Sequence, residues 1–176
     1  MPFEFQPYLR SALLEVRPLV AEDYDDLYAE AADPLLWEQH PDKDRWRPAG
    51  FRSFFNEALV SGGALTVVDA GDRRVIGSSR FHGHDEQLSE VEIGWTFLAR
   101  SHWGGLYNGE LKRLMLCHAF TYVSTVVFLV APGNLRSQRS VEKIGAVPSG
   151  SRRDASGRQS LVYRLEDRDW ADAAAK

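Results

Sequence analysis

The sequence predicts an α/β domain with a mixed sheet, and two observations lead to this prediction. Segments with alternating or β-branched apolar residues, which are typical of strands, are interleaved with segments whose apolar residues recur every three or four positions, which is typical of helices. Strands separated by helices favour a layered domain in which helices cover a sheet. The predicted order along the chain is β-α-α-β-β-β-α-β-α-β-β, without an internal repeat or a dividing linker.

The chain has the length and composition of one globular domain. It contains 176 residues, and the apolar fraction of 44% is enough for a core. We therefore expect a single domain over residues 1–176, with residues 1–12 as an N-terminal arm and residues 167–176 as a C-terminal tail. The formal net charge is −4, which argues against a nucleic-acid partner because nucleic-acid-binding proteins normally carry an excess of basic residues.

Cysteine content and hydropathy indicate the compartment that we expect. The only cysteine is Cys117, so the chain has no partner for an internal disulfide and no cluster of thiols for zinc. The first ten residues lack the basic start and apolar stretch of a signal peptide, and no apolar run approaches the length of a membrane span. We expect a cytoplasmic protein with no membrane partner and no metal.

The first half of the chain is expected to form a strand, two helices and a β-hairpin, at residues 13–20, 21–32, 49–60, 64–69 and 75–81. Acidic residues in the first turn favour the helix at residues 21–32, because the helix N-terminus is positive. The helix at residues 49–60 presents Phe51, Phe54 and Phe55 on one face, and the hairpin closes across the turn at residues 71–74.

The second half is expected to form three strands and two helices, at residues 90–98, 108–123, 125–130, 137–144 and 159–165. Residues 90–98 alternate strictly between apolar and polar or small side chains, whereas residues 125–130 are a continuous apolar, largely β-branched run that indicates burial on both faces. Residues 149–157 are polar and rich in turn-forming residues, and the tail at residues 167–176 is compatible with a frayed helix.

The most informative segment joins the strand at residues 90–98 to the following helix. The connecting loop contains Gly104 and Gly105, which allow the backbone to approach a ligand closely. Backbone N–H groups at a helix start are unpaired, and the helix dipole is positive there, so this arrangement suits a phosphate or pyrophosphate. A tight turn without a ligand is the alternative. The chain has neither a P-loop motif nor the GxGxxG motif of dinucleotide-binding folds.

Two motifs in this part of the chain resemble those of the GNAT acetyltransferases, especially the RimJ/RimL-like branch, whose first pattern is close to E-I-G-Y-W-L followed by W-G-x-G-Y-A-x-E-A. The residues that match this pattern are Glu92-Ile93-Gly94-Trp95, Trp103, Gly104, Tyr107 and Glu110. The second pattern is N-x-x-S-x-R-x-x-E-K-x-G-F, and its matches are Asn134, Ser137, Arg139, Glu142, Lys143 and Gly145. The resemblance covers residues 13–165.

The resemblance implies a mostly antiparallel sheet of six or seven strands, flanked by helices, with acetyl-CoA in a V between the two central strands. It implies an acyltransferase that moves an acetyl group to a primary amine by direct attack. The acceptor would be the N-terminal α-amine of a protein or peptide, or a small amine. Apart from the resemblance, exposed apolar surface makes a second copy of the chain a candidate partner. The cofactor-binding residues that it implies are Phe97, Leu98, Trp103, Gly104, Gly105, Leu106, Tyr107, Asn108, Asn134 and Ser137.

Acetyl transfer needs a base, because a protonated amine has no lone pair with which to attack the thioester. Glu92 matches the family's carboxylate and is the expected base, and Glu90, on the same face of the strand, is the alternative. For both residues, the alternative to a catalytic role is that of an exposed strand carboxylate in a salt bridge. Other GNAT members carry a tyrosine that protonates the leaving thiolate; the matching position here is Val141, and the neighbouring Ser140 is a weak substitute.

Two further expectations concern the acceptor site and an alternative function. Four aromatic residues in the early helical region are expected either to line the acceptor pocket or to cover the sheet: Trp37, His40, Trp46 and Phe51. Leu106 replaces the second glycine of the loop motif, and no tyrosine stands at position 141. These two departures favour the alternative function, a CoA-binding module or sensor without catalytic activity.

Overall fold

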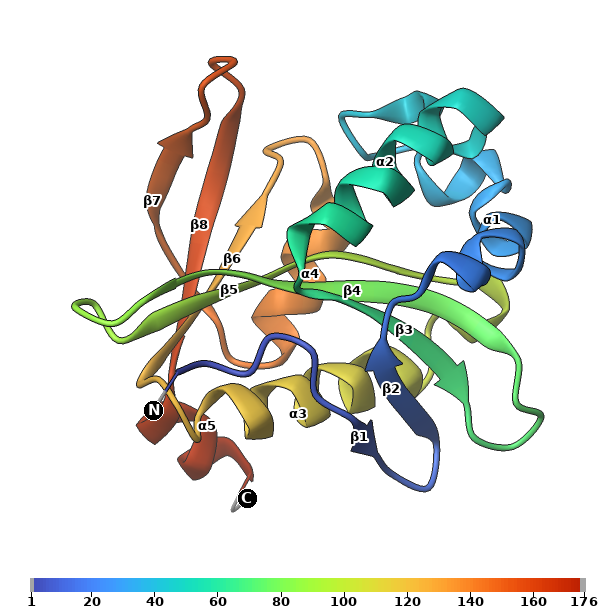
Figure 1. Ribbon diagram of the computed structural model, residues 1–176. Coiled ribbons are helices and arrows are strands. Elements are labelled where there is room, and N and C mark those ends of the chain that lie inside the picture. The colour runs from blue at the N-terminus through green and yellow to red at the C-terminus, as the bar shows by residue number, and fades with distance from the viewer. Residues whose placement is uncertain (1, 175–176) are drawn as a thin grey trace.

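A single eight-stranded sheet runs through the molecule, in the order β1-β2-β3-β4-β5-β6-β8-β7. The computed structural model describes residues 2–174 and is drawn in Figure 1. The strands are β1 (Leu9–Arg10), β2 (Leu14–Pro18), β3 (Ala64–Asp69), β4 (Val75–Asp85), β5 (Glu90–Leu98), β6 (Thr125–Val130), β7 (Val147–Arg153) and β8 (Gln159–Glu166). The α-helices are α1 (Tyr24–Ala31), α2 (Pro48–Ser61), α3 (Tyr107–Ala119), α4 (Leu135–Lys143) and α5 (Asp167–Ala174).

Helices cover both faces of the sheet (Figure 1). On one face, α3 places Leu111, Met115 and Leu116 in a core that includes residues from β2 to β6 and from β8. On the other face, α1 and α2 bury a second, aromatic-rich cluster in which Phe51 and Phe54 pack near Phe97 of β5. The predicted layered α/β class with helices on a mixed sheet is therefore confirmed.

All neighbouring strands are antiparallel except β5 and β6. The parallel pairing of these two strands covers only three residue pairs and stops at Glu92 and Val127. Beyond that point β5 stays paired with β4 as far as Leu98, while β6 stays paired with β8 as far as Val130. Because each strand follows a different neighbour, the two central strands diverge and leave a wedge, which opens toward their C-terminal ends.

A bulge in β5 lies beside this wedge. Ser78 and Arg80 of β4, two positions apart, face Phe97 and Gly94 of β5, three positions apart, so β5 carries one extra residue. Trp95 adopts a φ of 52°, which is unusual for a residue with a large side chain. The bulge changes which face the following side chains occupy, so that Phe97 joins the cluster beneath α1 and α2.

The predicted elements are present, with differences in number and extent. The strand predicted over residues 75–81 continues to Asp85, and the helix predicted over residues 137–144 spans Leu135–Lys143. The sheet has eight strands rather than six or seven, because the arm at residues 1–12 adds β1 and because β7 begins at Val147 and extends into the segment 149–157 that reads as a loop. The helix predicted over residues 108–123 spans Tyr107–Ala119. The expected frayed tail contains α5, and its residues 175–176 lie outside the described residues. No helix within residues 2–174 combines the length and apolar character needed to cross a membrane.

Candidate functional site

The predicted glycine-containing loop and helix start lie at the open end of the wedge. After β5, the loop places Gly104 at a φ of 70° and leads directly into α3. The backbone N–H groups of residues 104–109 donate to no acceptor among the described residues, and the first helical bond starts at the N–H of Glu110. Six free donors at the N-terminus of α3 form a cradle that can hold a phosphate group.

Trp103 departs from the expected arrangement. Its backbone N–H donates to the carbonyl of Arg100 at 3.1 Å, so this group is not free for a phosphate. The indole Nε1 donates to the Leu98 carbonyl at 2.9 Å, and the Arg136 guanidinium of α4 lies 4.1 Å above the ring. Trp103 therefore braces the cradle, and the free donors begin one residue later, at Gly104. Leu106, within the cradle, is 74% exposed.

Asp69, at the end of β3, fixes the loop in place. Its Oδ2 accepts a hydrogen bond from the hydroxyl of Tyr107 at 2.8 Å and lies 3.1 Å from Nε2 of His102. Its Oδ1 accepts from the backbone N–H of Gly71 at 2.7 Å. The hydrogen bond from Tyr107 is the main cause that lowers the pKa of Asp69, so this carboxylate stays charged and holds both sides of the loop.

Glu92 is a half-buried carboxylate with no hydrogen-bond or ion-pair partner among the described residues. It stands at the last position of β5 that pairs with β6, where the wedge begins, and its side chain folds over Gly94. Burial raises the pKa of Glu92 to about 7, against smaller opposing effects of the Arg152 and Arg80 charges. A carboxylate with this pKa changes its charge at neutral pH and can accept a proton there.

Glu90, the alternative base, has a different environment. Its side chain is almost completely buried and accepts hydrogen bonds from Arg152 at 3.1 Å and from Arg164 at 2.8 Å. Each carboxylate oxygen is thus held by one arginine, from β7 and from β8, which lie beyond β6 in the sheet. This ion pairing indicates a structural role for Glu90 and distinguishes it from the unpaired Glu92.

Arg80 lies on β4 opposite Gly94, two register positions from Glu92, and is 5% exposed. Its Nε and Nη2 atoms are buried and have no hydrogen-bond partner among the described residues. The guanidinium lies 4.5 Å from the ring centre of Trp95 at the bulge. Burial lowers the pKa of Arg80 to about 10, and the residue still carries a positive charge that acts on Glu92.

The predicted site residues that follow β6 in the chain lie at the start of α4 and within it. The Asn134 side chain accepts a hydrogen bond from the N–H of Ser137 at 3.2 Å and so caps α4; Ser137 is not the cap. The hydroxyl of Ser140 accepts from Nδ2 of Asn108 at 2.7 Å, which connects α4 to the cradle. Asn108 and Ser140 are thereby brought together, and Val141, which replaces the family's tyrosine, is buried in the core.

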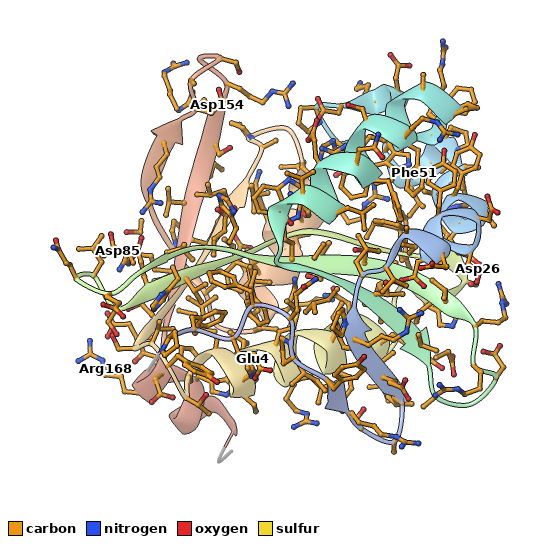
Figure 2. All side chains as sticks on the ribbon, in the orientation of Figure 1. Glu4, Asp26, Phe51, Asp85, Asp154 and Arg168 are labelled. Atoms are coloured by element: carbon orange, nitrogen blue, oxygen red, sulfur yellow. The ribbon has the colours of Figure 1, made fainter. Side chains whose placement is uncertain are left out.

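The four aromatic residues expected near the acceptor separate into two groups. Phe51 is fully buried among Tyr24, Phe54 and Phe55 beneath α2 and lines no pocket; Figure 2 labels it within the crowded side chains there. Trp37 is 4% exposed and donates to the Ala31 carbonyl at 2.8 Å. These two residues cover the sheet because their large rings pack in the aromatic cluster.

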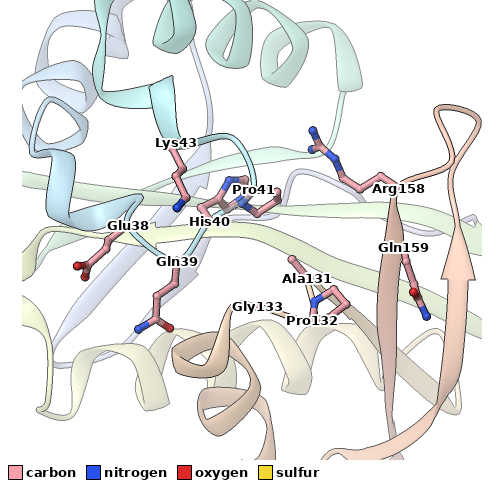
Figure 3. A pocket seen from close by; sticks show the side chains of 10 residues that line it. All are labelled: Glu38, Gln39, His40, Pro41, Lys43, Ala131, Pro132, Gly133, Arg158 and Gln159. Atoms are coloured by element: carbon pink, nitrogen blue, oxygen red, sulfur yellow. The ribbon is translucent and has the colours of Figure 1, made fainter.

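His40 and Trp46 lie nearer to the surface. The carbonyl of Trp46 accepts a hydrogen bond from the Tyr28 hydroxyl at 3.2 Å. His40 lines a pocket of about 400 Å³ that opens between the segment 38–43 and the end of β6, with Pro132, Gly133 and Arg158 opposite (Figure 3). Burial lowers the pKa of His40 to about 4, so its imidazole is neutral at pH 7 and contributes no charge to this pocket.

Sequence reasoning missed three residues of the site. Asp69 and Arg80 come from the hairpin, whose pattern indicates only strands, and their contacts depend on tertiary structure. Lys112 of α3 is 4% exposed, and a signal for it was present. It shares the helical spacing of Met115, Leu116 and Ala119, all of which are buried in the core.

Comparison with known proteins agrees with this architecture. The model of the acetyltransferase (GNAT) domain matches residues 14–147. No curated protein matches the chain. A GCN5-related N-acetyltransferase from Brucella melitensis superposes with a TM-score of 0.84 at 18% identity, over 97% of this chain and 83% of that one.

Two further solved structures show the same fold. An acetyltransferase from Agrobacterium tumefaciens has a TM-score of 0.73 at 24% identity, over 95% of this chain and 98% of that one. A candidate ribosomal-protein-serine acetyltransferase from Vibrio cholerae has a TM-score of 0.76 at 13% identity, over 91% and 97% of the two chains. The family match covers most of the chain and contains β2 to β6 with the cradle and Glu92, so this protein belongs to the GNAT acetyltransferase family.

Proposed function

We propose that the protein is an acetyl-CoA-dependent N-acetyltransferase that acetylates a primary amine by direct attack, with Glu92 as the general base. The observation that carries the proposal is the unpaired Glu92 carboxylate at the start of the wedge, with its pKa raised by burial to about 7. A base with a pKa near the working pH is the most effective proton acceptor.

The residues of this chain fit acetyl-CoA as the acetyl donor. The free N–H groups of residues 104–109 would hold the pyrophosphate, and the diverging strands β5 and β6 would flank the pantetheine arm. When bound, the donor supplies an acetyl group activated as a thioester. Backbone N–H groups at the bulge near Phe97 are the candidate donors to the thioester carbonyl, an interaction of the oxyanion-hole type.

Glu92 would take the proton from the acceptor amine, directly or through water. An α-amine has an ordinary pKa of about 7.7–8.0, against about 10.4 for a lysine side chain, so a carboxylate with a pKa of about 7 is well matched to an α-amine. Together with the RimJ/RimL-like motifs, this favours the N-terminus of a protein or peptide as acceptor. A small amine is the second candidate.

A CoA-binding module without catalysis is the competing function. The absence of a tyrosine at position 141 favours it, because that position then offers no proton to the leaving thiolate. The leucine at position 106 does not remove the donors of the cradle, because the backbone N–H groups of residues 104–109 have no acceptor among the described residues.

The test is an acceptor screen that follows thiol release from acetyl-CoA with N-terminal peptides, lysine peptides and small amines. We expect release with at least one α-amine, and a fall of about 10²–10⁴-fold in kcat for Glu92→Gln. The matched control is Glu86→Gln, at an exposed carboxylate in the β4–β5 connection. Tight CoA binding without thiol release from any amine would favour the module, and an unchanged kcat in Glu92→Gln would exclude Glu92 as the base.

A further inference from the structure

Lys112 of α3 brings its amine into contact with side chains of both diverging strands, β5 and β6. Its Nζ donates to Oγ1 of Thr96 on β5 at 2.7 Å and lies 5.6 Å from the ring centre of Phe128 on β6. Both residues lie beyond Glu92 and Val127, where the pairing of the two strands ends. The amine therefore lies against the wedge on the face of the sheet that α3 covers and, since the residue is 4% exposed, it is shielded from bulk water.

No charged group of the described residues pairs with this amine. Its neighbours are the Thr96 hydroxyl, which in turn lies 2.8 Å from Ser79 Oγ of β4, and the Phe128 ring of β6. The nearest charges on α3 itself, Glu110 and Arg113, form an ion pair with each other. An ammonium can donate three hydrogen bonds, and here one acceptor is present, so two donors are left for a further partner.

A buried amine without a counter-ion destabilises the fold, and a function in the wedge would explain why it stands there. Desolvation is the only cause that shifts its pKa, and it lowers the pKa of Lys112 to about 7. An ordinary alkyl thiol has a pKa of about 8.5. Proton transfer from this ammonium to a thiolate is therefore favourable, which is the property required of the acid in thioester cleavage.

We propose that Lys112 is the general acid of the reaction and gives its proton to the thiolate of CoA as that group leaves. The inference rests on the proposed function, because it needs the thioester to lie in the wedge. It assigns a role that Val141 cannot fill, because valine has no proton to give. Lys112 suits the role better than Ser140, because an aliphatic hydroxyl is a far weaker acid than this ammonium. The Lys112 amine also contacts side chains of both diverging strands.

The proton balance of the reaction closes with these two residues. The acceptor ammonium loses two protons, one before and one after its nitrogen bonds to the carbonyl carbon, and Glu92 passes both to water. The carbon–sulfur bond breaks and its electron pair goes to sulfur, which takes a proton from Lys112 Nζ. Lys112 recovers a proton from water, so the products are the amide, the free thiol of CoA and one released proton.

The decisive experiment titrates the thiol of CoA bound to the whole protein, followed by the ultraviolet absorbance of the thiolate. We compare the native protein with Lys112→Met, which keeps the length and apolar character of the side chain but removes its charge. Lys112→Gln, a second variant that keeps a hydrogen-bond donor, serves if the first fails to fold. The matched control is Arg113→Met, the neighbouring cation on the exposed side of α3.

We expect an ammonium beside the sulfur to lower the thiol pKa, so the bound thiol titrates about one pH unit higher in Lys112→Met than in the native protein and in Arg113→Met. With the acceptor found in the screen, we expect kcat of the native protein to fall as pH rises above 7, because Lys112 then loses its proton. Lys112→Met should not show this fall, and its profile on the acidic side should be unchanged.

Equal thiol pKa values in all three proteins would overturn the acid role while acetyl-CoA binding stays intact. Loss of CoA binding in Lys112→Met alone would also overturn it, in favour of a binding role. Absence of CoA binding in the native protein would overturn the proposed function itself.

Discussion

The carboxylate of Glu92 lies directly over the Cα of Gly94, two residues further along β5. A Cβ atom built at position 94 would stand 3.2 Å from Oε1 of Glu92, closer than most contacts of real Cβ atoms. The match to the GNAT motif at Glu92-Ile93-Gly94 thus has a physical reason here. A glycine at position 94 leaves the space that the proposed base occupies.

Gly94→Ala is expected to displace the Glu92 carboxylate by a few tenths of an ångström without disrupting β5. Because a displaced base is poorly oriented, kcat should fall by about tenfold while acetyl-CoA binding stays unchanged. Steady-state kinetics with a calorimetric Kd for acetyl-CoA measure this. Native kcat in a folded Gly94→Ala protein would mean that the carboxylate position does not matter.

Glu92→Gln should make the protein more stable at alkaline pH. Burial raises the pKa of Glu92 from 4.5 to about 7, so the ionised form destabilises the folded state as pH rises from 4.5 through 7. The variant removes this effect and should gain about 2–3 kcal/mol in unfolding free energy at pH 8, with no gain below pH 4. Urea unfolding at the two pH values measures the difference. A gain that is equal at both would contradict the raised pKa.

Glu90→Gln should have the opposite effect. It leaves Arg152 and Arg164 without their shared carboxylate, and since both arginines are partly exposed we expect a loss of about 1–3 kcal/mol in stability. Because Glu90 is not the proposed base, the acidic side of the pH–rate profile should stay in place. Denaturant unfolding and the pH dependence of kcat check both parts. A profile that loses its acidic side would make Glu90 the base instead.

Arg80→Met should raise the pKa of Glu92 further. The Arg80 charge lowers that pKa against the effect of burial, so its removal shifts the acidic side of the pH–rate profile to higher pH. Stability should stay the same or rise, because two buried and unpaired nitrogen atoms disappear while contact with Trp95 is kept. The control is Arg74→Met, at an exposed arginine paired with Glu30. An unshifted profile would show that Arg80 does not act on Glu92.

The sequence predicts the fold well because its apolar periodicities are local. Alternation in residues 90–98 and the apolar run of residues 125–130 fix the two central strands, and the glycine loop between them fixes the cradle. The short edge strands β1 and β7 are not predictable in this way. Residues 147–153 are all exposed and become a strand only because β8 offers a partner edge.

The candidate site is predictable where a motif carries it and not where packing makes it. Glu92 and the cradle follow from sequence, and so does Asn134, which the structure places as a helix cap. The separation of Glu90 from Glu92 depends on two arginines that lie 62 and 74 positions away along the chain. Lys112 shares its helical spacing with buried residues, but the strand side chains that its amine contacts are known only once α3 is placed against the sheet.

The proposed function requires that the wedge and the cradle bind acetyl-CoA, and calorimetric titration of the native protein with acetyl-CoA measures this binding. We expect one site per chain with a Kd in the micromolar range, about −8 kcal/mol. Absence of binding at millimolar acetyl-CoA would exclude the proposed function and leave only the fold.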